Sequence, residues 1–146
     1  MDAKGKENRR CPSCGHASLV AQTIRDEFEY GAEGERVLVV ADAVPVLVCP
    51  ACGETFFGPA AARVRHQAIC VAMGLLTPDQ IKGVREKLGK NQAEFAKLTG
   101  IGVATLSRWE CGRLIQTRAM DRYLRLLQTI PEASRFLESP IFMQPV

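Results

Sequence analysis

The sequence predicts an α+β chain, with a small β-rich N-terminal domain followed by an all-α bundle. Two observations carry this prediction. A Cys-Pro-x-Cys-Gly motif occurs twice, at 11–15 and 49–53, and the residues between the copies form runs rich in valine and other β-formers. From residue 59 onward, apolar residues instead recur at helical spacing between capping residues and glycines. The length of 146 residues accommodates two small domains.

Residues 1–10 are mostly charged or polar and contain no apolar run. We expect a disordered leader there, and neither a signal peptide nor a membrane anchor. No window of the chain approaches the apolar length that spans a bilayer. Six cysteines without an export signal favour metal or redox chemistry over structural disulfides. We therefore expect a cytoplasmic protein that does not contact a membrane.

Each cysteine motif is typical of a zinc knuckle, because cysteines two residues apart can point both thiolates at one ion. The glycine that follows permits the tight turn. Two knuckles predict one closed, structural Zn²⁺ site per chain, with no open position for catalysis. A thiol-disulfide oxidoreductase is the alternative, but it would be expected beside a βαβ pattern. His16 follows the first knuckle, and we expect it at the surface because four thiolates suffice. The predicted ligands are Cys11, Cys14, Cys49 and Cys52.

The residues between the knuckles predict strands only. One strand covers residues 19–30, a turn covers 31–34, and a second apolar run covers 36–48. Asp42 and Pro45 interrupt the second run, which favours two shorter strands. An antiparallel meander brings its ends together, so both knuckles can reach one ion. We expect the metal-binding domain to cover residues 11–58.

Residues 59–76 predict a helical linker between two domains, with a helix that Gly74 ends. Thr77 is then a strong N-cap signal, because Pro78 follows it and Gln80 closes a capping box. The second domain is predicted to cover residues 77–138, followed by a tail at 139–146.

Residues 91–112 predict two short helices joined by a tight turn. Asn91 caps the first helix, with Glu94 three residues on closing a capping box, and Gly100 and Gly102 bracket the turn. Ile101 is apolar where a solvent-exposed loop would be polar, so we expect it to fill the angle between the helices. This is the arrangement of a helix-turn-helix, whose second helix lies in the major groove of double-stranded DNA. A plain helical hairpin is the alternative.

If Leu106 and Trp109 face inward, a period of 3.6 residues turns other residues of the second helix toward DNA. Arg108 suits bidentate pairing with guanine. Gln92 and Arg113 lie at the ends of the motif, where phosphate contacts are better placed. The predicted base contacts are Val103, Ala104, Ser107 and Arg108, and the predicted phosphate contacts are Gln92 and Arg113.

Two further helices complete the predicted bundle. Thr117 caps a helix whose apolar face includes Tyr123 and Leu127, and residues 131–138 form a shorter helix. This apolar surplus belongs to the core or to a homodimer seam that spaces two recognition helices about 34 Å apart on a palindrome.

Formal charge differs between the two halves. Residues 1–58 carry six Lys and Arg against nine Asp and Glu, a net charge of −3, whereas residues 59–146 carry 13 against seven, a net charge of +6. The basic half contains the predicted helix-turn-helix, and its charge would attract a polyanion.

Two resemblances follow from these motifs. Residues 78–130 resemble the XRE (Cro/C1-type) helix-turn-helix, through Asn91-Gln92-Ala93, Ile101 and the run 106–112. The paired knuckles, the apolar lead-in at 44–50 and this bundle, in that order, resemble the MqsA (YgiT-type) antitoxins over residues 11–138.

The MqsA resemblance implies a non-enzymatic antitoxin of a type II toxin-antitoxin system. Its zinc domain would bind a toxin, usually an mRNA-cleaving ribonuclease, and its dimeric C-terminal domain would repress its own operon. The family's zinc ligands fall on the four predicted cysteines, and its recognition arginine falls on Arg108. Ala104 departs from the family's base-contacting asparagine, so the operator sequence is not implied. A stand-alone, zinc-stabilised XRE regulator without a toxin is the alternative.

Overall fold

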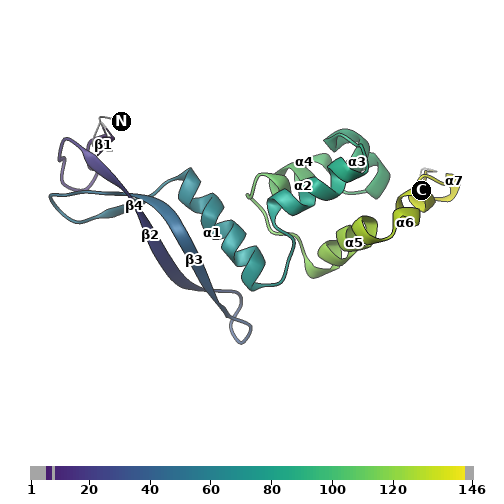
Figure 1. Cartoon of the computed structure of the whole chain (residues 1–146), viewed down its shortest axis with the longest axis horizontal. Coiled ribbons are helices and arrows are strands. Elements are labelled where there is room, and N and C mark those ends of the chain that lie inside the picture. The colour runs from purple at the N-terminus through teal and green to yellow at the C-terminus, as the bar shows by residue number, and fades with distance from the viewer. Residues whose placement is uncertain (1–5, 8, 144–146) are drawn as a thin grey trace. The chain divides into compact units, whose positions relative to one another are not determined.

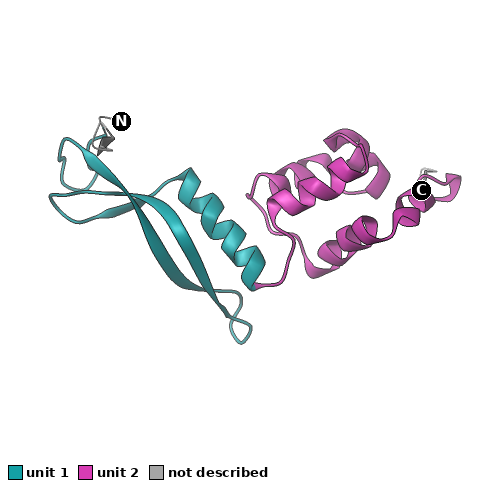
Figure 2. Cartoon of the chain, in the orientation of Figure 1, with its two compact units in different colours: residues 1–72 teal, residues 73–146 magenta. Residues whose placement is uncertain are grey.

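The computed structural model describes residues 6–7 and 9–143, and it divides into two compact units. Unit 1 covers residues 1–72 and unit 2 covers residues 73–146 (Figure 2). A four-stranded antiparallel sheet lies in unit 1 and a set of helices in unit 2, so the predicted α+β class is confirmed (Figure 1). In the described part of the chain, no helix is long and apolar enough to cross a membrane.

The sheet has the strand order β1-β2-β3-β4. Its long central pair consists of β2 (Leu19–Tyr30) and β3 (Val37–Val48), and two short strands flank it: β1 (Lys6–Glu7) and β4 (Thr55–Phe57). The prediction of a wholly disordered leader is wrong at residues 6–7, because β1 pairs with the outer edge of β2. The leader residues 1–5 and 8 lie outside the described residues.

The strand β3 is continuous, although Asp42 and Pro45 predicted an interruption. Between the pairs Ile24–Val44 and Asp26–Ala41, one residue of β2 faces two residues of β3, which is a β-bulge. Ala43 takes up the extra residue with a left-handed φ of 58°. The bulge shifts the side-chain alternation by one position, so Ala41 and Val44 are both buried.

The helix α1 (Pro59–Ala72) packs alongside β3 and belongs to unit 1 (Figure 1). The structure thus places in unit 1 residues 59–72 of the segment that the sequence predicted as a separate linker, and residues 73–76 in unit 2. Ala61 is fully buried against the apolar face of β3, and Val64 and Ala68 pack beside it, because burying this stripe removes apolar surface from water. Arg65 extends over the ring of Phe28 and ion-pairs with Asp26 at 2.8 Å.

Unit 2 contains the predicted bundle. Its helices are α2 (Pro78–Lys87), α3 (Gln92–Thr99), α4 (Val103–Glu110), α5 (Arg118–Thr129), α6 (Pro131–Leu137) and α7 (Pro140–Met143). The predicted tail therefore includes the short helix α7, and residues 144–146 lie outside the described residues. Both predicted capping boxes form, at Thr77 with Gln80 and at Asn91 with Glu94.

The core of unit 2 draws on the four helices from α2 to α5. Phe95, Leu106 and Leu124 are fully buried at its centre, and Ile101 and Trp109 pack against them. A buried carboxylate fixes the segment that leads into α2. Asp121 accepts a hydrogen bond from the Leu76 amide at 2.7 Å and another from the Gln116 side chain at 3.1 Å. Arg125 ion-pairs with the same carboxylate at 2.7 Å.

Candidate metal centre and nucleic-acid interface

The structure brings the four predicted cysteine ligands together. The sulfur atoms of Cys11, Cys14, Cys49 and Cys52 all lie within 4.8 Å of one another. Val20 pairs with Val48, so the chain segments that lead to the two knuckles meet at one end of the sheet. The predicted meander is therefore the reason that residues far apart in sequence share one site.

The two knuckles have matching backbone geometry. The amide of Cys11 donates to the His16 carbonyl and the amide of Cys49 to the Glu54 carbonyl, each at 2.9 Å. The glycines after the second cysteine of each knuckle, Gly15 and Gly53, adopt left-handed φ values of 76° and 75°. A side chain would be strained there, which explains the glycine in both motifs. The His16 side chain is exposed, in agreement with its predicted surface position.

The sulfur positions fit a tetrahedral thiolate site. Zn–S bonds of about 2.3 Å at tetrahedral angles place sulfurs about 3.8 Å apart. The Cys11 and Cys52 sulfurs are separated by 3.7 Å, and those of Cys14 and Cys49 by 3.6 Å. Four thiolates are a donor set that selects zinc or an iron–sulfur centre over a hard cation. The residues present therefore fit the predicted Zn²⁺.

Local hydrogen bonds favour a thiolate at Cys49. Burial alone would raise the pKa of the Cys49 thiol, but the backbone amides of Cys52 and Ala51 donate to its sulfur and lower that pKa to about 6. A backbone hydrogen bond from Glu54 lowers the pKa of the Cys52 thiol, but burial and the neighbouring sulfurs of Cys49 and Cys14 outweigh it and raise that pKa to about 12. The four thiols therefore do not ionise independently, and metal binding must displace their remaining protons.

The second candidate site is the pair of helices α3 and α4. Gly100 ends α3 with a left-handed φ of 75°, and Ile101 fills the angle between the helices with 8% of its surface exposed. Leu106 and Trp109 face the core, as predicted. The tight turn and the two inward anchors fix which side of α4 points outward.

All five predicted DNA contacts on α4 and just beyond it are exposed. They are Val103, Ala104, Ser107, Arg108 and Arg113. Gln92 lies at the first turn of α3 and is only partly buried, but its side-chain nitrogen donates to Glu110 at 2.8 Å. The residue predicted as a phosphate contact is thus also part of an internal network.

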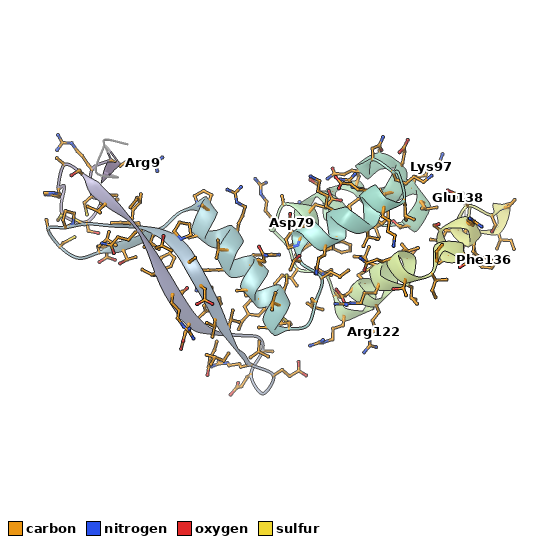
Figure 3. All side chains as sticks on the ribbon, in the orientation of Figure 1. Arg9, Asp79, Lys97, Arg122, Phe136 and Glu138 are labelled. Carbon is orange, nitrogen blue, oxygen red and sulfur yellow. The ribbon has the colours of Figure 1, made fainter. Side chains whose placement is uncertain are left out.

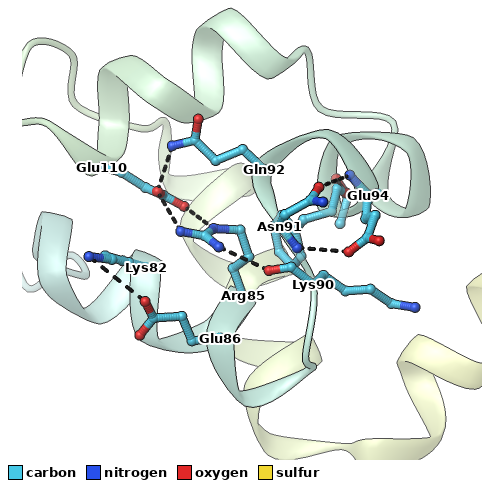
Figure 4. Close-up of polar contacts among 10 residues, drawn as sticks. Lys82, Arg85, Glu86, Lys90, Asn91, Gln92, Glu94 and Glu110 are labelled. Atoms are coloured by element: carbon cyan, nitrogen blue, oxygen red, sulfur yellow. Dashed lines mark hydrogen bonds and ion pairs between the residues drawn. The ribbon is translucent and has the colours of Figure 1, made fainter.

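Figure 4 shows this network, which sequence reasoning missed. Arg85 of α2 donates to both carboxylate oxygens of Glu110, at 2.7 and 3.1 Å, and to the Lys90 carbonyl at 2.9 Å. Burial would raise the pKa of Glu110, but the hydrogen bonds from Arg85 and Gln92 outweigh it and hold that pKa below its usual value. In the sequence, the signal for this pair was Glu110, a charged residue at the end of the amphipathic helix α4.

Comparison with known proteins identifies the family. The family described as the antitoxin component of the bacterial toxin-antitoxin system, MqsA, matches residues 9–137. The chain belongs to the MqsA antitoxin family. This match covers both candidate sites and confirms the resemblance seen in the sequence.

A curated relative is also named as an antitoxin. The chain is 33% identical over 57 residues to Antitoxin HigA-2 of Vibrio cholerae serotype O1, a match that covers 39% of this chain and 55% of that protein. The chain thus spans about half the length of this relative. Within the MqsA family, the cysteine cluster of unit 1 is the candidate metal centre and the outer face of α4 is the candidate nucleic-acid interface.

Proposed function

We propose that this member of the MqsA family neutralises a toxin, typically an mRNA-cleaving ribonuclease, through unit 1 and represses its own operon through unit 2, in the cytoplasm. The observation that carries the DNA-binding part is the outer face of α4, where Arg108 and Ser107 are exposed on a helix whose other side is fixed in the core. The toxin-binding part rests on the family membership. Both activities are binding functions and require no catalytic residue.

One Zn²⁺ held by the four cysteines would have a structural role in this proposal. All four ligand positions come from the protein, so no position is open for a reacting molecule. The ion would join the start of β2 to the end of β3 and so stabilise the domain that contacts the toxin.

A homodimer would place two copies of α4 on a palindromic operator. Unit 2 has unused apolar surface for such a contact, because Leu126, Ile130 and Phe136 are exposed. The Phe136 ring contacts the Phe142 ring at a centroid distance of 5.3 Å and a tilt of 59°. Arg122 projects away from α5 (Figure 3).

The DNA-binding proposal is tested by separating base reading from phosphate contact. Arg108→Ala should weaken operator binding by about 1 to 3 kcal/mol and relax specificity at one position of each half-site. Arg113→Ala should weaken binding to all sequences alike and reduce the slope of log affinity against log salt by about one. Binding isotherms on the operator and on a scrambled duplex, at several salt concentrations, measure both effects. If Arg108→Ala lowers the affinity for both duplexes equally, Arg108 contacts phosphate, and Val103, Ala104 and Ser107 read the bases.

The toxin-binding proposal is tested with the product of the gene adjacent to this one. The full-length chain should co-purify with that protein and restore growth to cells that express it. A chain that represses its operator but neither binds nor neutralises that protein would instead be a stand-alone XRE-family regulator.

A further inference from the structure

The β3 strand of unit 1 has an open edge. β2 pairs with β3 on one side from Val37 to Val48, but β4 pairs on the other side only with Val46–Val48. Among the described residues, no strand pairs with that side of residues 37–42 (Figure 1). Every second residue of a strand turns its N–H and C=O groups to one side, so this edge can hydrogen-bond to an incoming strand.

A groove of about 510 Å³ runs beside this edge, between β3 and α1. Leu38 of β3 is 65% exposed and Val71 of α1 is 67% exposed, so large apolar side chains flank the groove in contact with water. A strand edge next to an apolar groove is the arrangement that binds an extended peptide, because main-chain hydrogen bonds give affinity and the groove receives alternate side chains. The lining includes Leu38, Val40 and Asp42 from β3 and Val64, Ala68 and Val71 from α1.

The charge around the groove indicates the chemistry of the occupant. Because α1 contributes Arg63 and Arg65, residues 1–72 carry a net formal charge of only −1. The acidic excess lies in the β2–β3 hairpin, where residues 25–42 contain six carboxylates against two guanidinium groups. Arg25 ion-pairs with Glu27 and Asp42, and Arg36 ion-pairs with Glu29, so a net formal charge of −4 remains on the hairpin. Asp42 lines the groove itself, and Glu27 and Glu29 lie one strand away on β2, opposite Val40 and Leu38.

This charge disfavours a second copy of the chain as the occupant. Pairing two β3 edges would bring two sets of the same carboxylates together, and like charges across an interface oppose association. A segment with basic side chains would instead be attracted to the hairpin and could insert its apolar side chains into the groove.

We propose that an extended basic and apolar segment of the toxin adds to the open edge of β3 as a further strand. Its alternate apolar side chains lie in the groove against Val64, Ala68 and Val71, and its basic side chains face the carboxylates of the hairpin. This proposal rests on the proposed function, because it names the surface by which unit 1 holds its toxin. The bulge at Ala43 ends the regular edge, so pairing is confined to residues 37–42.

The test uses the full-length chain and the purified product of the adjacent gene. Leu38→Lys and Val71→Lys each place an ammonium group in the groove, where it would repel a basic segment and be desolvated by an apolar one. Each should raise the Kd for the toxin by about tenfold or more. Ala62→Lys is the matched control, because it adds the same charge to an exposed position of α1 outside the groove lining, and it should leave the Kd unchanged. Zinc content and circular dichroism should be the same for all variants.

Hydrogen exchange of the wild-type complex gives a second readout. Amide exchange in a peptide that spans residues 37–42 should slow when the toxin binds. If the toxin binds the wild-type chain, but both groove variants bind as tightly and these amides stay unprotected, the groove proposal is wrong and the proposed function stands. Groove variants that change the oligomeric state and not the toxin affinity would mean that a second copy occupies the edge. A wild-type chain that does not bind the toxin would overturn both proposals.

Discussion

The ion pair between Arg85 and Glu110 provides a direct test of how α4 is held in unit 2. The two side chains are 12% and 6% exposed, and their closest atoms are 2.7 Å apart. Glu110→Ala removes the acceptor of three hydrogen bonds, two from Arg85 and one from Gln92. Among the described residues, the guanidinium would then keep one hydrogen-bond partner, the Lys90 carbonyl, and a charge interaction with Glu86.

Removing one partner of a buried pair costs about 3 to 5 kcal/mol, because the remaining charge is left without compensation. Arg85 keeps one carbonyl partner, so we expect the lower end, about 3 kcal/mol, for Glu110→Ala. For a domain of this size, such a loss lowers the melting temperature of unit 2 by about 12 °C or more. The double variant Arg85→Met/Glu110→Leu should recover most of it, since packed apolar groups can replace a buried pair.

An exposed ion pair elsewhere in unit 2 is the control. Lys90 and Glu138 are 3.1 Å apart, and their side chains are 31% and 51% exposed, so Glu138→Ala should cost less than about 0.5 kcal/mol. Urea unfolding monitored by Trp109 fluorescence measures all variants. A loss below about 1 kcal/mol for Glu110→Ala would refute the view that this pair holds α4.

The pH dependence of the same variant follows from the sign of the pKa shift. The pKa of Glu110 is lowered in the folded state, so the pair contributes its full stability above the unfolded value of about 4.3. That contribution is lost as pH falls through the lower folded pKa. The difference in unfolding free energy between wild type and Glu110→Ala should therefore be constant near neutral pH and shrink only in acid.

Two predictions concern unit 1. Cys49→Ser should abolish zinc binding and unfold unit 1, because a structural zinc site contributes on the order of 10 kcal/mol of folding free energy. Operator binding by unit 2 should persist. Elemental analysis measures the zinc content and operator titration measures DNA binding, and a folded unit 1 without zinc would contradict the prediction. Ala43→Gly should stabilise unit 1 by about 1 kcal/mol, because glycine adopts the left-handed φ of 58° without strain. An unchanged melting temperature of unit 1 would show that the backbone at the bulge is not strained.

Features set by neighbouring residues could be read from the sequence. The capping boxes at Thr77 and Asn91 involve partners three residues away, and both form as predicted. The knuckles are equally local, because each needs only two cysteines and a glycine in one turn. The inward direction of Leu106 and Trp109 follows from the helical period alone.

Features set by distant partners could not be read in this way. The stripe of Val64 and Ala68 on α1 is compatible with a linker, a dimer contact or a sheet-packing helix, and only the β3 surface decides among them. The pairing of Arg85 with Glu110 spans 25 positions, and many other carboxylates lie within reach in the sequence. The bulge at Ala43 depends on the register between β2 and β3, which no single strand reveals.

Gln92 is where the internal network of unit 2 meets the predicted DNA surface. One hydrogen of its side-chain nitrogen is committed to Glu110 at 2.8 Å, and the second is available to a phosphate. Gln92→Ala should therefore weaken binding to the operator and to a scrambled duplex alike, without changing the salt dependence, because no charge is removed. It should also lower the unfolding free energy of unit 2 by about 1 kcal/mol through the lost bond to Glu110. If stability falls while affinity for both duplexes is unchanged, Gln92 acts only in supporting α4, and the phosphate contact near this end of the motif must come from another residue.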